Sequence, residues 1–250
     1  MFPIYLKHQE SFSPPAEPTF FLLARNGVYL VKRSPLYEAI TQFSGALPGL
    51  ATQQPQLRLH LPKLPQTMLE QLVGFFLEVF QRYGTEAMAV LFYSQEGGFR
   101  VGVPWQQVRR LGDGASTAGN YHVRYQRYPR PAHCLQLGTI HSHGDQPAMH
   151  SCVDAWDEQY VDGLHIVVGD LTAPRPSFST AFVASGQRFQ LPPEMVLAGY
   201  AHPRLPAPAG WLTRITCHTD QAPAWSDDNH PPRWRSDDAA TPASGPAEAD

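Results

Sequence analysis

Residues 66–93 join a helical hydrophobic pattern to an almost wholly apolar segment, and this order limits what the chain can fold into. In "QTMLEQLVGFFLEVFQRYG" the apolar residues recur at spacings of three and four, which predicts an amphipathic helix with Gly84 as its C-cap. The next segment, "EAMAVLFY", lacks polar alternation and therefore predicts a strand buried on both faces. A helix that covers a buried strand indicates an α/β or α+β fold.

The second half of the chain continues this pattern. "CLQLGTIHSH" predicts a buried strand, "SCVDAWDEQYVDG" a helix and "LHIVVGDL" another buried strand, while "SFSTAFVASGQRFQL" predicts a final hairpin. Because strands and helices alternate here, we expect a mixed sheet flanked by helices.

A smaller, β-rich region precedes this pattern. "FFLLARNGVYLVKR" predicts a hairpin around Asn26-Gly27, because Asn-Gly accepts the positive φ of a tight turn. "LYEAITQF" predicts a short helix, and "LRLHLPKLP" alternates before two prolines interrupt it. We therefore expect an N-terminal region over residues 1–62 and a larger domain over residues 63–218.

The last segment, residues 219–250, differs in composition. Seven acidic and two basic residues give it a net charge of −5, which leaves +2 for the rest of the chain. Five prolines lie between Pro223 and Pro246. A polar, proline-rich segment buries too little apolar surface to order itself, so we expect a disordered acidic tail.

Composition also excludes several classes of protein. Hydrophobic residues make up 42% of the chain, but no apolar run reaches the ~18 residues of a membrane span. The first residues lack the apolar core of a secretory signal, so we expect a cytoplasmic protein that does not contact membranes. The net charge of −3, without a dense basic stripe, argues against direct binding of nucleic acid. Three cysteines without a CxxC pair form neither a disulfide framework nor a cysteine zinc knuckle.

Two histidines and an aspartate in "HSHGDQPAMHSCVD" have the spacing of a metal site. His141 and His143 are two apart at a strand end and so face the same way. Ser151 and Asp154 are three apart on the following helix and share one face of it. If the loop folds back, Asp154 supplies a third ligand and leaves a fourth position for water, which is the plan of a catalytic zinc site.

A capping box offers a simpler explanation for part of this motif. Ser151 as N-cap and Asp154 three residues later fit that pattern without any metal. It does not explain why His141 and His143 stand at the end of an apolar strand. The complete pattern H-x-H-x7-S-x-x-D is expected roughly 0.001 times by chance in a chain of this composition, so we favour the metal site.

The motif resembles the signature of the JAMM (MPN-plus) zinc metalloproteases, which include deubiquitinating isopeptidases and prokaryotic relatives. The resemblance extends from about Leu64 to His218. The flanking segments "PWQQV", "GTIHSHG" and "DEQYVDGLHIVVGD" are most similar to a prokaryotic branch encoded in the PRTRC gene cassette. That cassette also encodes a ubiquitin-activating-enzyme-like protein and a ParB-related protein. The resemblance implies a JAMM/MPN-type mixed sheet.

The resemblance also implies roles for individual residues. His141, His143 and Asp154 would bind one Zn²⁺ per chain, and Glu86, in the place of the family's upstream glutamate, would be the general base. Ser151 would hydrogen-bond the oxyanion, a contact whose loss can cost ~3–4 kcal/mol. The implied substrate is a ubiquitin-like protein or its conjugates, and the activating-enzyme-like protein of the cassette is a further expected partner.

Other functions compete for the same motif. A non-catalytic scaffold of the same fold usually lacks metal-site residues, whereas this chain has all of them. A cupin needs a further glutamate and histidine, a zinc deaminase needs H-x-E with P-C-x-x-C, and neither pattern is present.

The residues next to the motif have simpler expected roles. His150 is expected in a loop and His165 in the core. Asp157 and Glu158 are expected early in the helix, where acids suit its dipole, with Asp157 a candidate to support a metal ligand.

Overall fold

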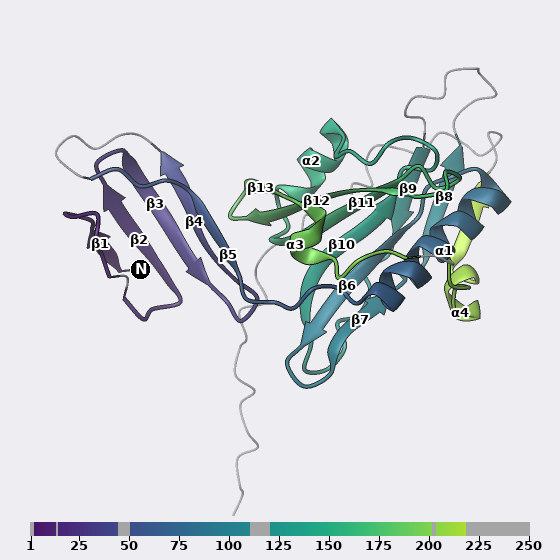
Figure 1. Cartoon of the computed structure of the whole chain (residues 1–250), viewed down its shortest axis with the longest axis horizontal. Coiled ribbons are helices and arrows are strands. Elements are labelled where there is room, and N and C mark those ends of the chain that lie inside the picture. Colours follow the sequence, from purple (N-terminus) through teal and green to yellow (C-terminus); the bar gives the residue numbers. More distant parts are fainter. Residues whose placement is uncertain (1–2, 14, 45–50, 111–120, 202–203, 219–250) are drawn as a thin grey trace, which may run out of the picture.

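Over the residues that it describes, the computed structural model of the chain contains three β-sheets and a few helices, a mixed α+β arrangement (Figure 1). This confirms the predicted class at that coarse level. Residues 111–120 and the predicted tail at residues 219–250 lie outside the described residues. Those described are 3–13, 15–44, 51–110, 121–201 and 204–218.

A five-stranded sheet forms the N-terminal region, drawn in purple and blue in Figure 1. Its strands are β1 (Ile4–Leu6), β2 (Thr19–Ala24), β3 (Gly27–Arg33), β4 (Tyr37–Ser44) and β5 (Gln56–Leu59). They lie in chain order; β1 pairs with β2 in parallel, and the other neighbours are antiparallel. Alternate residues of β2 and β3 form a small core of their own: Phe20, Leu22, Ala24, Tyr29 and Val31.

One expectation for this region was wrong, whereas the predicted hairpin forms from β2 and β3 with only its turn displaced. "LYEAITQF" forms strand β4 rather than a helix, and Tyr37, Ala39 and Thr41 are buried in strand alternation. β4 pairs with a strand on each side, so sheet pairing outweighs the local pattern. The hairpin turn lies one residue before the predicted Asn-Gly pair, because Ala24 pairs directly with Gly27.

Helix α1 (Gln66–Tyr83) confirms the amphipathic pattern and ends as predicted. Gly84 adopts a left-handed conformation with φ 62°, and its N–H donates to Phe80 O at 2.8 Å. No helix in the described ranges is long and apolar enough to cross a membrane. The face of α1 that packs on the larger sheet buries Leu69, Leu72, Val73, Phe75, Phe76 and Val79.

The larger sheet has six strands in the order β13-β12-β11-β10-β6-β7. β10 and β11 are parallel, and all other neighbours are antiparallel, so the sheet is mixed as predicted. The central strands are buried on both faces, which explains their nearly continuous apolar sequences. The strands are β6 (Met88–Ser94), β7 (Gly98–Gly102), β10 (Leu135–Ser142), β11 (Gly163–Gly169), β12 (Ser177–Ala184) and β13 (Gln187–Leu191).

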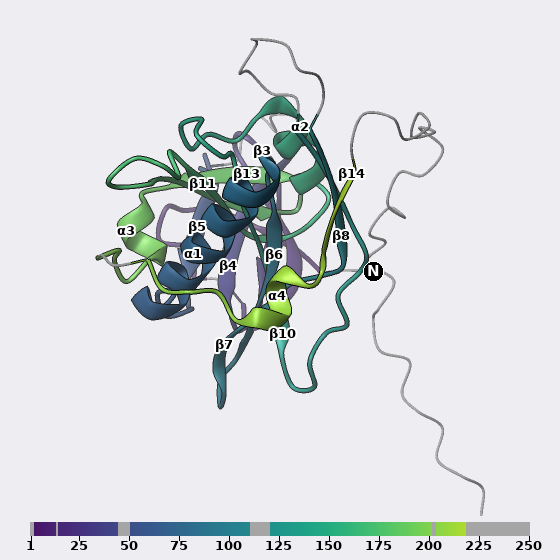
Figure 2. The same cartoon turned by 90° about the vertical axis from the view of Figure 1, so that its right-hand side faces the viewer.

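The remaining elements surround this sheet (Figure 2). A three-stranded sheet has the order β14-β8-β9, with β14 and β8 parallel. Helix α2 connects β10 to β11 and carries part of the predicted site. The elements are β8 (Gln106–Arg110), β9 (Tyr121–Tyr125), β14 (Ile215–His218), α2 (Cys152–Glu158), α3 (Pro193–Val196) and α4 (Ala209–Leu212).

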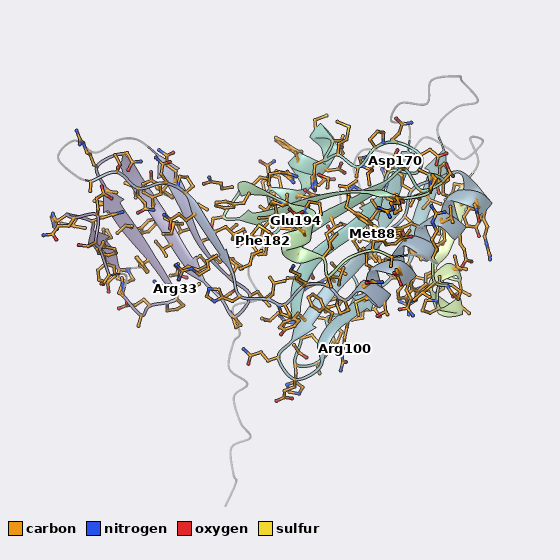
Figure 3. The ribbon with its side chains drawn as sticks, viewed as in Figure 1. Arg33, Met88, Arg100, Asp170, Phe182 and Glu194 are labelled. Atoms are coloured by element: carbon orange, nitrogen blue, oxygen red, sulfur yellow. The ribbon has the colours of Figure 1, made fainter. Side chains whose placement is uncertain are left out.

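Asp162, in the turn after α2, joins the N-terminal sheet to the larger domain. Lys32 of β3 forms an ion pair with its carboxylate, and Tyr37 of β4 donates a hydrogen bond to it at 3.0 Å. The Tyr37 ring also packs against Phe182 of β12, which Figure 3 labels, with ring centroids 4.8 Å apart. β5 ends at Leu59 and α1 starts at Gln66, on either side of the boundary predicted between residues 62 and 63.

We expect Gly138→Ala to lower the free energy of unfolding by roughly 3 kcal/mol or more. Gly138 has φ 154°, and a Cβ there would lie 1.8 Å from the backbone oxygen of Leu164 in β11. It also ends a register shift between β10 and β6, three residues before His141. Urea denaturation measures the change. Gly210→Ala, in open space in α4, is the control and should change stability by ~1 kcal/mol at most.

Candidate metal centre

The parallel pairing of β10 and β11 places α2 beside the predicted histidines. A parallel pair needs a crossover connection, and α2 is the helix of that crossover. The chain therefore leaves the carboxyl end of β10 and enters α2 close by. His141 and His143 lie on one side of the strand, and Ser142 between them is fully buried on the other. The N–H of His143 donates to Val168 O at 2.8 Å, which holds it against β11 beyond the strand end.

His141, His143 and Asp154 form a compact group that can hold a metal ion. The two histidine Nε2 atoms are 3.2 Å apart. Asp154 Oδ1 lies 3.3 Å from His141 Nε2, and Asp154 Oδ2 lies 3.3 Å from His143 Nε2. Tetrahedral ligands about 2.0–2.1 Å from a zinc ion are separated by about 3.3–3.4 Å. The two imidazole nitrogens, and each nitrogen with the carboxylate oxygen nearest to it, are thus close to that separation, and one ligand atom from each of the three residues lies within 4.8 Å of the others.

The capping box is also present and forms part of the same group. Ser151 Oγ accepts from the Asp154 N–H at 3.1 Å, and the Ser151 N–H donates to Asp154 Oδ2 at 2.7 Å. The two explanations of the motif therefore do not exclude each other. The capping contacts fix the rotamer of Asp154, so that its carboxylate faces the histidines.

The charges in this group favour a cation. Burial acts to lower the pKa of His141, but the hydrogen bond and negative charge of Asp154 raise it above its usual value. Burial acts to raise the pKa of Asp154, but its contacts with His141 and His143 hold it far below its usual value. A carboxylate that stays ionised beside two imidazoles is suited to bind a metal ion, which displaces the imidazole protons.

Glu86 lies next to this group, two residues before β6. The pairing of β6 with β10 sets Met88 opposite His141. Ser142 extends that pairing, because its N–H donates to Ala87 O at 3.0 Å and its Oγ accepts from the Ala87 N–H at 3.2 Å. Burial raises the pKa of Glu86 to about 7. The charges of the two histidines act to lower this pKa, and the charge of Asp154 acts to raise it. Glu86 therefore interacts electrostatically with all three candidate ligands.

Ser151 is placed to donate a hydrogen bond toward the site. It precedes α2 as the N-cap, and its Oγ already accepts one bond from the helix backbone. A hydroxyl that accepts from the backbone still has its own proton to donate. The structure therefore brings together Glu86, His141, His143, Ser151 and Asp154, the five residues predicted for the site.

A buried polar cluster behind α2 was not predicted. Glu158 was expected early in the helix but lies at its end, because α2 is only seven residues long. It is buried and faces Arg188 of β13, His150 and His165. His165 lies in the core, as predicted, whereas the side chain of His150 is only 6% exposed despite its place in a loop. Asp157, the residue proposed to support a ligand, is exposed at the surface.

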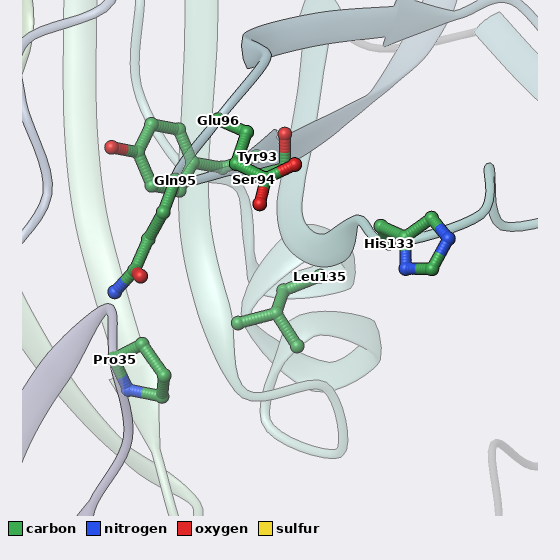
Figure 4. A pocket seen from close by; sticks show the side chains of 7 residues that line it. All are labelled: Pro35, Tyr93, Ser94, Gln95, Glu96, His133 and Leu135. Carbon is green, nitrogen blue, oxygen red and sulfur yellow. The ribbon is translucent and has the colours of Figure 1, made fainter.

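On sequence alone, two other acids could take the place of Glu86. Glu96 lies beyond the far end of β6, where it lines a pocket of about 300 Å³ with His133, Leu135 and Pro35 (Figure 4). That pocket is at the opposite end of β6 and β10 from the metal group. Asp145 is exposed and accepts a hydrogen bond from the Thr172 N–H at 3.2 Å. For these reasons neither acid replaces Glu86 as the carboxylate beside the candidate ligands.

Comparison of the chain with protein-family models, curated proteins and solved structures found no match. The site itself therefore carries the functional information: two imidazoles, a carboxylate at ligand spacing and a further, partly buried glutamate.

Proposed function

We propose that the chain is a JAMM-type, zinc-dependent isopeptidase that acts in the cytoplasm on a ubiquitin-like protein or its conjugates. The observation that carries the proposal is the clustering of His141, His143 and Asp154 at ligand spacing beside the partly buried carboxylate of Glu86. The three cysteines are all free, which suits a reducing compartment.

The donor set fits zinc. Two imidazole nitrogens and one carboxylate resemble the ligands of known zinc peptidases, in which a fourth position stays open. The ligand side chains are 12–19% exposed, so a substrate can approach them. When bound, zinc polarises a carbonyl and lowers the pKa of water to about 7. The same two-histidine, one-carboxylate set also occurs in non-haem iron(II) oxygenases, so iron is the second metal to test.

The protein's own residues supply the proton transfers. Glu86 accepts a proton from the attacking water and then passes it to the leaving amine, which requires a carboxylate within reach of both. Its raised pKa suits this exchange near neutral pH. The Ser151 hydroxyl keeps its proton and donates a hydrogen bond to the oxyanion that develops on the scissile carbonyl. No serine nucleophile is required.

The alternative is a non-catalytic scaffold of the MPN fold, acting in a PRTRC-type complex with the activating-enzyme-like protein. A scaffold has no need for a general base next to a metal site. Glu86 lies partly buried beside the candidate ligands although removing its charge from water is unfavourable, and this favours catalysis.

Metal content and cleavage together test the proposal. Purified protein should bind one zinc per chain in preference to iron. The zinc form should cleave either of two probes: ubiquitin joined through its C-terminal carboxyl to a lysine ε-amine of a fluorescent peptide, or the same linkage made with a ubiquitin-like protein. Stoichiometric zinc without cleavage of either probe would favour the scaffold. Preferential binding of iron would exclude the zinc peptidase.

A further inference from the structure

Helix α2 is attached to the domain in an unusual way. The one residue that it buries is a glutamate, Glu158. Its large apolar residues point outward: Val153 is 63% exposed and Trp156 is 62% exposed. Burial of apolar surface, which fixes most helices, therefore contributes little to holding α2 in place.

Polar contacts of Glu158 replace that apolar packing. Its carboxylate forms an ion pair with Arg188 of β13. Oε2 also lies 3.2 Å from His150 Nδ1, and Oε1 lies 3.8 Å from His165 Nδ1. The side chain of Glu158 is 8% exposed, so these contacts act with little screening by solvent. One carboxylate thus joins the end of α2 to β11, to β13 and to the residue just before the Ser151 N-cap.

One partner of Glu158, His165, is itself held in place by hydrogen bonds. One ring nitrogen of His165 lies 2.9 Å from Thr139 Oγ1 on β10, and the other lies 2.9 Å from Val161 O. Thr139 and His165 are directly opposite each other in the β10–β11 pair. Through His165 and Thr139, Glu158 therefore links the end of α2 to β10, the strand that also carries His141.

Asp154 and Glu158 are four residues apart, so they lie on the same face of α2. The capping box fixes the rotamer of Asp154 relative to the helix, but it does not fix the helix relative to the strand. We propose that Glu158, through Arg188, is a positioning residue that holds α2 so that the Asp154 carboxylate meets His141 and His143 at ligand distance. This inference rests on the proposed function only in taking these three residues as the metal ligands.

Stability alone is a poor explanation for the ion pair between Glu158 and Arg188. Removing two charges from water is costly, and apolar residues of similar volume often stabilise as well as a buried ion pair does. A carboxylate that is hydrogen-bonded to Arg188 and lies beside two histidines, in contrast, favours one position and orientation for a short helix. Residues behind metal ligands typically change metal affinity by 10- to 100-fold when they are replaced.

The test measures zinc affinity, without any substrate. Glu158→Gln and Arg188→Met should each weaken zinc binding by about 10- to 100-fold in a competition titration with a chromophoric chelator. The visible absorption spectrum of the cobalt(II)-substituted protein should also change, because it reports the geometry of the ligands. Arg188→Lys keeps the positive charge and should recover part of the zinc affinity.

A matched control separates positioning from general destabilisation. Glu38→Gln breaks the ion pair between Arg33 and Glu38 in the N-terminal sheet. The nitrogen and oxygen of this pair are 2.8 Å apart, and its two side chains are only 20–21% exposed. This replacement should leave zinc affinity and the cobalt spectrum unchanged. If Glu158→Gln does not fold, Arg188→Met and Arg188→Lys carry the test. The Arg188 side chain is 24% exposed, so its replacement disturbs the core less than replacement of Glu158 does.

The outcomes distinguish this inference from the proposed function. Wild-type zinc affinity and cobalt spectra in the folded Glu158 and Arg188 variants would overturn the positioning role, as would an equal loss of affinity in Glu38→Gln. If the wild-type protein binds no zinc, the proposed function itself fails. Loss of peptide cleavage does not enter this test.

Discussion

Replacing Glu86 with glutamine is expected to lower isopeptide cleavage by ~10²–10⁴-fold, the usual effect of losing a general acid–base group. Glutamine keeps the size of the side chain but cannot accept a proton from water. Zinc content should remain at one per chain, because the ligand group consists of His141, His143 and Asp154 without Glu86. Steady-state cleavage and metal analysis of the same preparation check both parts of this expectation.

The pH profile gives an independent signature of Glu86. A general base must be ionised, so the wild-type rate should rise with pH through the pKa of this group. That pKa is raised to about 7 by burial in the metal-free protein, and a cation held by the neighbouring ligands will lower it. The acidic limb should therefore lie below pH 7 and should be absent in Glu86→Gln.

Glu96→Gln is the matched control for this experiment. Glu96 is an exposed acid beyond the other end of β6, and its replacement should leave both rate and profile unchanged. A wild-type cleavage rate in Glu86→Gln would show that another group accepts the proton. Loss of zinc from Glu86→Gln would mean that this residue binds the metal or maintains the fold.

The parts of the fold that were predicted are those whose pattern is local and strong. α1 could be predicted because its apolar residues repeat over 18 residues and end at a glycine that readily adopts positive φ. β6 and β11 could be predicted because strands buried on both faces need apolar residues at nearly every position.

The parts that were missed depend on distant partners. β4 resembled a short helix, and only its pairing with β3 and β5 makes it a strand. β14 pairs in parallel with β8, which precedes it by about a hundred residues, and neither strand has a strong pattern of its own. Such pairing is decided by tertiary contacts that a local sequence window does not contain.

The site shows the same division. The histidine pair and Asp154 could be predicted, because strand and helix periodicity place each of them on a known face. Glu158 could not, since its charge suggested an exposed position, and its partner Arg188 lies 30 residues further along the chain. A helix whose apolar residues face outward is the signal that could have indicated a buried polar contact behind it.

Replacing His141 with alanine is expected to abolish stoichiometric zinc binding and, with it, cleavage. It removes one of three protein ligands and leaves an imidazole and a carboxylate, which cannot form the three-ligand face of a catalytic zinc site. The fold should persist, because β10 is held by backbone pairing to β6 and β11 on either side. A ligand that binds only the folded state stabilises it by ~2.7 kcal/mol at a concentration of 100 Kd. Zinc should accordingly raise the thermal midpoint of the wild-type protein and leave that of His141→Ala unchanged.

His60→Ala is the control for this last experiment, because His60 is an exposed histidine just beyond β5 in the N-terminal region. It should retain one zinc per chain and the full zinc-dependent rise of the thermal midpoint. If His141→Ala also retains one tightly bound zinc, other residues hold the metal. The clustering of the two imidazoles and the carboxylate would then have to be explained by the hydrogen bonds and charges of the metal-free group alone.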